Sequence, residues 1–153
     1  MQKQSAFYFL LIFLMCSCGH NSTFSDKNDL KVSTKVDSLY KLVMAKHDEV
    51  MPKTSDITKH TKILRQKLEG TKNNSEKENI LSLLQKLQSA DDAMLEWMHD
   101  FKNIHLDKDF YENKSEKELV AYLKEEEIKI DNVAKQMLES IGNADLYLKA
   151  NNK

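Results

Sequence analysis

The first helical segment carries one apolar stripe that keeps its register from residue 32 to residue 68. Its centre repeats every seven residues, at Val36, Val43, Val50, Ile57 and Leu64, and its flanks are Leu39, Leu42, Ile63 and Leu68. This period predicts one long amphipathic helix. Pro52 lies inside the stripe and predicts a kink, because proline lacks a backbone N–H and its ring clashes with the preceding turn. The alternative is a break at Pro52, with a second helix starting near Thr54 or Ser55.

Two more helices are predicted, each behind a capping-box pattern. Gly70 begins the turn at residues 70–74 and suits the left-handed position after a helix. Ser75 with Glu78 predicts the start of the second helix, and Ser115 with Glu118 predicts the start of the third. The inward face of the second helix is Ile80, Leu83, Leu84, Leu87, Ala90, Met94, Trp97, Met98, Phe101 and Ile104. That of the third is Leu119, Leu123, Ile130, Val133, Met137, Ile141, Ala144 and Leu148.

These stripes predict an all-α fold, an antiparallel bundle of three long helices with the first helix kinked at Pro52. Residues 105–114 are predicted to form a loop whose Phe110 and Tyr111 close one end of the core. A many-stranded sheet is excluded, because the chain has only three Gly and one Pro to make its turns.

The first residues have the pattern of a bacterial secretion signal. Lys3 precedes an apolar run at residues 6–15, which is too short to span a bilayer because a spanning helix needs about 20 apolar residues. Ser17 and Cys18 then resemble the lipobox of bacterial lipoproteins, in which the cysteine is acylated and begins the mature chain. Cys16 is the alternative lipid site. A Cys16–Cys18 disulfide or redox pair is the other alternative, but a pair this close has poor disulfide geometry.

We therefore expect a signal peptide at residues 1–17, a lipidated Cys18 with a flexible tether to residue 29, and a helical domain at 30–153. The residues just after Cys18 hold no acidic run of the kind that exports lipoproteins to the cell surface. This favours the outer membrane, facing the periplasm.

Charge and motifs exclude several functions. The chain has 23 Lys and Arg against 24 Asp and Glu, a net charge of −1, with both signs interleaved. This balance argues against binding to nucleic acid or to an anionic lipid surface. The sequence contains no Gly-rich phosphate loop, no nucleophile elbow and no haem-attachment motif. We expect a protein that is not an enzyme.

Each stripe is interrupted near its middle by one polar residue: His47, Asp91 and Glu126 respectively. Antiparallel packing around a turn near Lys72 places His47 opposite Trp97. The same slab of the bundle contains Met44, Met51, Met94 and Met98.

Two hypotheses follow from this layer. Imidazole with thioethers suits copper or a haem iron, and imidazole with two carboxylates suits a harder ion, so the layer is a candidate ligand site in a bundle core. The alternative is a hydrogen-bonded polar layer that fixes the register of the helices. The other histidines of the helical region, His60, His99 and His105, are expected to face solvent.

Residues 47–53 (HDEVMPK) and 90–101 (ADDAMLEWMHDF) resemble small lipoproteins of the Bacteroidota commonly labelled viral A-type inclusion protein. The resemblance covers the first two helices and the lipoprotein signal. This chain departs from the family pattern at Thr54 and Leu95, where methionine is common. The resemblance implies a helical envelope protein and no known activity.

The sequence thus predicts a lipid-anchored helical bundle of the cell envelope. We expect a structural or protein-interaction module that binds another envelope protein or associates with itself. The second hypothesis is a bundle that binds copper, iron or haem through its central layer.

Overall fold

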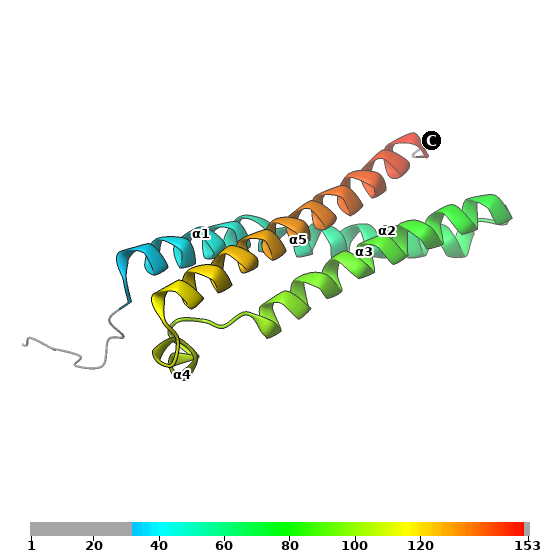
Figure 1. Cartoon of the computed structure of the whole chain (residues 1–153). Coiled ribbons are helices and arrows are strands. Elements are labelled where there is room, and N and C mark those ends of the chain that lie inside the picture. The colour runs from blue at the N-terminus through cyan, green and yellow to red at the C-terminus, as the bar shows by residue number, and fades with distance from the viewer. Residues whose placement is uncertain (1–31, 152–153) are drawn as a thin grey trace, which may run out of the picture.

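The computed structural model describes residues 32–151, which form three long helices and one short one (Figure 1). The first long helix comprises α1 (Thr34–Val50), the 3-10 turn η1 (Met51–Lys53) and α2 (Thr54–Gly70). It is followed by α3 (Asn74–Asp100), the short α4 (Lys108–Glu112) and α5 (Glu116–Ala150). No strand occurs among these residues, so the prediction of an all-α bundle is confirmed.

Two features concern the membrane. The expected signal peptide at 1–17, the lipidated Cys18 and the tether to residue 29 lie outside the described residues. Within residues 32–151, no helix combines the length and the apolar character that a membrane span requires.

Pro52 interrupts the first helix as its covalent structure requires. The helix tightens into the 3-10 turn η1 at this point, and α2 begins directly afterwards at Thr54. The interruption is small, because the Met51 N–H still donates to the His47 carbonyl. Val50 and Ile57 stay buried on the two sides, so the stripe does not change register. The predicted kink is confirmed.

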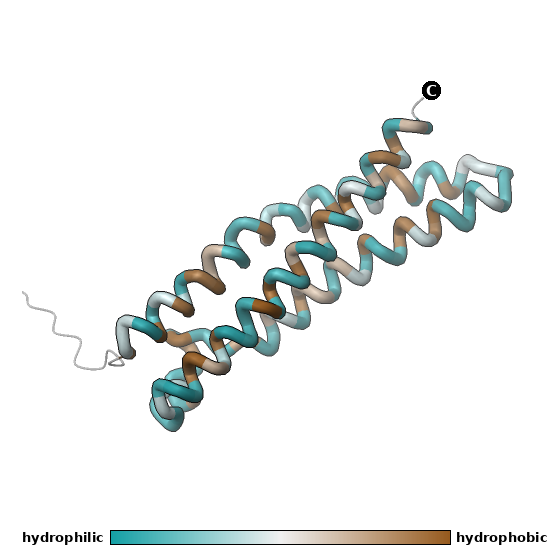
Figure 2. Tube along the Cα trace, turned by 45° about the horizontal axis from the view of Figure 1, so that its top comes forward, coloured by the Kyte–Doolittle hydropathy of each residue, from teal (hydrophilic) through white to brown (hydrophobic). Residues whose placement is uncertain are grey.

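The three predicted stripes form one continuous core (Figure 2). All heptad positions of the first helix and the whole predicted face of the third are buried. α1 packs chiefly on α5, whereas α2 packs on α3 as well as on α5. Two positions contradict the prediction, because Leu42 and Met98 have 50% and 42% of their surface exposed. Both lie at the edges of their stripes, where a neighbouring helix no longer covers them.

The helix termini confirm one capping box and contradict the other. The Ser115 side chain accepts a hydrogen bond from the Glu118 N–H, and the Glu118 carboxylate accepts one from the Ser115 N–H. α3 instead begins one residue before Ser75, with Asn73 as its N-cap. Gly70 is also not left-handed: no residue between 32 and 151 has a positive φ, and α2 ends through the extended Thr71.

Candidate functional site

His47 and Trp97 meet on the seam between α1 and α3. Their rings stack with centroids 5.6 Å apart and planes at 29°, as the antiparallel register predicted. His47 Nδ1 lies 2.9 Å from Asp48 Oδ1. Since a carboxylate only accepts, this contact places a proton on Nδ1. The Nε2 nitrogen has no hydrogen-bond partner within residues 32–151, and 16% of the side chain is exposed.

The Trp97 ring is buried among aromatic side chains, with 6% of its surface exposed. It also stacks near Phe101, with ring centroids 4.8 Å apart. Its Nε1–H is fully buried and has no acceptor within the described residues. A buried indole N–H usually finds a partner. On this seam, the Trp97 ring, whose N–H has no acceptor within the described residues, therefore lies beside a half-buried imidazole.

The four methionines of the central layer lie in different environments. Met44 and Met51 are half-buried on the side of α1 that carries His47. Met94 is fully buried in the core, and Met98 is exposed at the surface of α3. Met44 and Met51 therefore lie with His47 along one face of the first long helix, Met44 in α1 and Met51 in η1.

The two carboxylates of the predicted layer do not join His47. Glu126 is 4% exposed on α5, and its Oε1 accepts a hydrogen bond from Lys129 Nζ at 2.9 Å. Bonds to Glu126 and Glu125 raise the pKa of Lys129. Asp91 is half-buried on α3. Within residues 32–151 no three His, Cys, Asp or Glu side chains lie close enough together to hold a metal ion. The arrangement of one imidazole and two carboxylates is therefore not formed.

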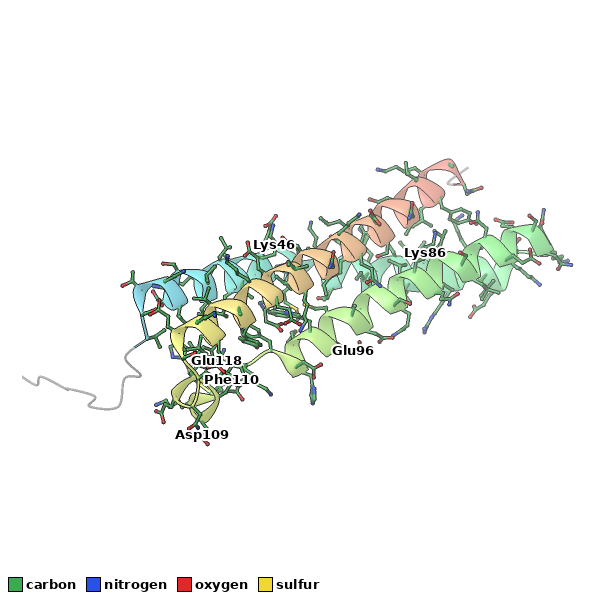
Figure 3. All side chains as sticks on the ribbon, viewed as in Figure 1. Lys46, Lys86, Glu96, Asp109, Phe110 and Glu118 are labelled. Carbon is green, nitrogen blue, oxygen red and sulfur yellow. The ribbon has the colours of Figure 1, made fainter. Side chains whose placement is uncertain are left out.

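The aromatic side chains of the predicted loop at 105–114 close one end of the bundle as predicted, but residues 108–112 of that loop form the short helix α4 (Figure 3). The Tyr111 hydroxyl donates to the Lys102 carbonyl at 2.8 Å, and the Tyr122 hydroxyl accepts from the Lys102 N–H at 2.6 Å. Phe110 packs edge-on against Tyr122. Burial raises the pKa of Tyr111, and it raises that of Tyr122 to about 12. These hydroxyls stay protonated and fix the loop, so their role is structural.

His60 is a buried polar residue, so the prediction that it faces solvent is wrong. Only 7% of it is exposed. Its Nδ1 bonds to the Asp56 carbonyl, and its Nε2 lies 2.7 Å from Asp145 Oδ1 on α5. The bond from His60 lowers the pKa of Asp145. The signal was present, because His60 lies three residues after Ile57 and four before Leu64, on the inward stripe. His99 and His105 are exposed as predicted.

A shallow groove of about 440 Å³ also runs between α3 and α5. Its lining is Ser82, Gln85, Lys86, Ser89, Gln136, Glu139, Ser140 and Asn143. The only one of these side chains that is buried, Ser140, donates its hydroxyl hydrogen to the Met137 carbonyl within its own helix. The groove is therefore a polar part of the helix interface, and the His47–Trp97 seam is the candidate site.

Comparisons with known protein families, curated proteins and solved structures give no significant match to this chain. The class of protein is defined by its fold, an all-α bundle of three long helices. Its candidate site is the half-buried imidazole of His47, which stacks on Trp97 between α1 and α3, with Met44 and Met51 half-buried on the same face of the first helix.

Proposed function

We propose that this protein is a lipid-anchored, non-enzymatic component of the cell envelope that binds a helix of another envelope protein along α3. The observation that carries this proposal is a second stripe on α3, beside the one that faces the core. The second stripe, called here the α3 flank, consists of Leu81, Leu84, Gln88, Asp91, Leu95 and Met98.

The α3 flank has the spacing of a helix-binding surface. Its positions alternate three and four residues apart, which is the spacing of the contact positions in a coiled coil. Leu81, Leu95 and Met98 have 51%, 54% and 42% of their surface exposed. Leu95 and Met98 are three residues apart and so lie next to each other on the helix. A partner helix that covered this flank would bury apolar surface now in contact with water.

Site-specific photocrosslinking in the cells that make this protein tests the proposal. A photoreactive amino acid at Leu95 is expected to crosslink to one envelope protein. The matched control is Glu96, the next residue, which is exposed on a different face of α3 (Figure 3). A crosslink to a second copy of this chain would identify self-association instead. No adduct at Leu95, or the same adducts at both positions, would refute binding through the α3 flank.

A charge on the flank supplies a second test. Leu95→Glu is expected to abolish the crosslink formed from a photoreactive residue at Gln88. It should change the free energy of unfolding by no more than about 0.5 kcal/mol, because the side chain is a surface position outside the core. A retained crosslink with Leu95→Glu would contradict the proposal.

The anchor is tested through the cysteines. Cys18→Ala is expected to abolish incorporation of a labelled fatty acid and to release the protein from the membrane fraction. Two acyl chains anchor stably, since each buried methylene contributes about 0.8 kcal/mol. Cys16→Ala is the control and should leave labelling unchanged. Labelling that persists in Cys18→Ala would contradict lipidation at this residue.

A further inference from the structure

We propose that Met44 and His47 of α1 and Met51 of η1 bind one Cu(I) ion, with the indole ring of Trp97 beside it. The donors are two thioether sulfurs and one imidazole nitrogen. Cu(I) favours such soft donors, whereas harder ions favour carboxylates and water. This site is separate from the partner binding proposed for the α3 flank, and each can fail without the other.

The backbone places the three donors on one face of the first long helix, with Met51 where α1 meets η1. Met44 is three residues before His47, and Met51 is four residues after it. These spacings bring side chains on successive turns next to each other. Pro52 does not disturb this register, because the Met51 N–H still donates to the His47 carbonyl. Both methionines are half-buried against the core, and the flexible side chain lets each sulfur turn toward the imidazole.

His47 is held in the form that binds a metal. Its Nδ1–H donates to Asp48 Oδ1 at 2.9 Å, so the lone pair of the neutral ring is on Nε2. A carboxylate on the far nitrogen is the usual support of a metal-binding histidine, because it fixes the ring and makes the other nitrogen more basic. The 16% exposure of the His47 side chain leaves a path for an ion.

Trp97 gives the site a second contact and an optical signal. Its ring stacks on His47 at 5.6 Å between centroids, so an ion bound to the imidazole is a neighbour of the indole. The electron-rich face of tryptophan attracts cations. Trp97 is the only tryptophan of the chain. Its fluorescence therefore reports this site alone.

Competition with a coloured Cu(I) chelator tests the proposal. The full chain is purified in detergent with Cys16→Ser and Cys18→Ser in every sample, so that no thiol binds copper. One equivalent of Cu(I), or of Ag(I) as its redox-inert substitute, is expected to bind and to quench Trp97. His47→Gln and Met44→Leu/Met51→Leu should lose this binding, and Asp48→Asn should weaken it by about 10- to 100-fold.

Two control variants distinguish Cu(I) binding at this site from binding at other histidines and methionines. His99 also pairs with the aspartate that follows it, at 2.8 Å, but its side chain is 88% exposed, so the His99→Gln variant should bind Cu(I) as tightly as the protein with His99. Met137→Leu replaces a buried methionine on α5 and should also bind normally. Circular dichroism of each variant checks the fold. The proposal is overturned if a folded His47→Gln variant binds Cu(I) as tightly as the protein with His47. It is also overturned if Trp97 fluorescence does not change when Cu(I) saturates the protein.

Discussion

The contact between His60 and Asp145 is expected to stabilise the end of the bundle where α2 meets α5. The two residues are 85 positions apart in sequence, and His60 Nε2 lies 2.7 Å from Asp145 Oδ1. Nδ1 must carry a proton, because its partner is a carbonyl oxygen. The contact with the carboxylate is therefore attractive when the ring carries both protons. His60→Gln removes the imidazole, and Asp145→Asn removes the negative charge.

The expected strength follows from the burial of the two side chains. An exposed ion pair contributes about 0.2–1 kcal/mol, and loss of one partner of a buried pair costs about 3–5 kcal/mol. Here the His60 side chain is 9% exposed and that of Asp145 46%. We therefore expect a coupling energy of about 1–2 kcal/mol, between these limits.

A double-mutant cycle measures this coupling directly. Urea unfolding of the wild type, His60→Gln, Asp145→Asn and the double variant gives four free energies of unfolding at about pH 5.5, where an ordinary imidazole is protonated and an ordinary carboxyl group is ionised. Independent sites are additive to within about 0.3–0.5 kcal/mol. A coupling energy inside that range would refute the reasoning, because the contact would then contribute nothing beyond its separate parts.

The dependence on pH gives a second measurement of the same contact. The hydrogen bond from His60 lowers the pKa of Asp145 in the folded protein. A lowered carboxyl pKa contributes stability that is complete above the unfolded value, about 3.9, and is lost as pH falls through the folded value. The difference in unfolding free energy between wild type and Asp145→Asn should therefore shrink at acid pH. A difference that does not change with pH would contradict this assignment.

The remaining predictions concern the core, a helix cap and the aromatic end, each measured by urea unfolding. Leu87→Ala should cost about 2–5 kcal/mol because Leu87 is fully buried, whereas Leu42→Ala should cost no more than about 0.5 kcal/mol. Ser115→Ala should cost about 0.5–2 kcal/mol by removing a cap, and Ser75→Ala, which removes none, should be nearly neutral. Burial raises the pKa of Tyr122 to about 12. Its contribution to the free energy of unfolding is therefore complete below about pH 10, the ordinary tyrosine value, and is lost as the pH rises further. Tyr122→Phe should remove this loss of stability at high pH.

The helices and most of the core could be predicted because the signal for them is local. A seven-residue period fixes which face of a helix is apolar, and burial of that face drives packing. This is why all five heptad positions from Val36 to Leu64 are buried. At the edge of a stripe the period does not decide whether a side chain is buried, because burial there depends on the position of the neighbouring helix. The predicted burial of Leu42 and Met98 is wrong for this reason.

The errors at the start of α3 and at His60 have a common physical cause. Asn73 and Ser75 can both cap a helix, so the local sequence does not decide between them. Here Glu76 accepts hydrogen bonds from Thr71 and from the Tyr147 hydroxyl of α5. These contacts fix the first turn of α3 and favour Asn73 as the cap. His60 likewise depends on Asp145 of α5, a partner that no local pattern can reveal.

Pro52 explains why the candidate copper site lies on the seam between α1 and α3. The 3-10 turn that follows Val50 separates a half that packs chiefly on α5 from a half that packs on α3 as well. α1 therefore contacts α3 through large rings, with Tyr40 stacked near Phe101 and His47 on Trp97. Large rings packed between two helices leave the residues beside them only partly buried. Methionine suits such positions because its flexible side chain fills irregular gaps. This partial burial holds the His47 ring against Trp97, leaves the methionine side chains free to turn toward it, and keeps the access from solvent that a fully packed core would deny.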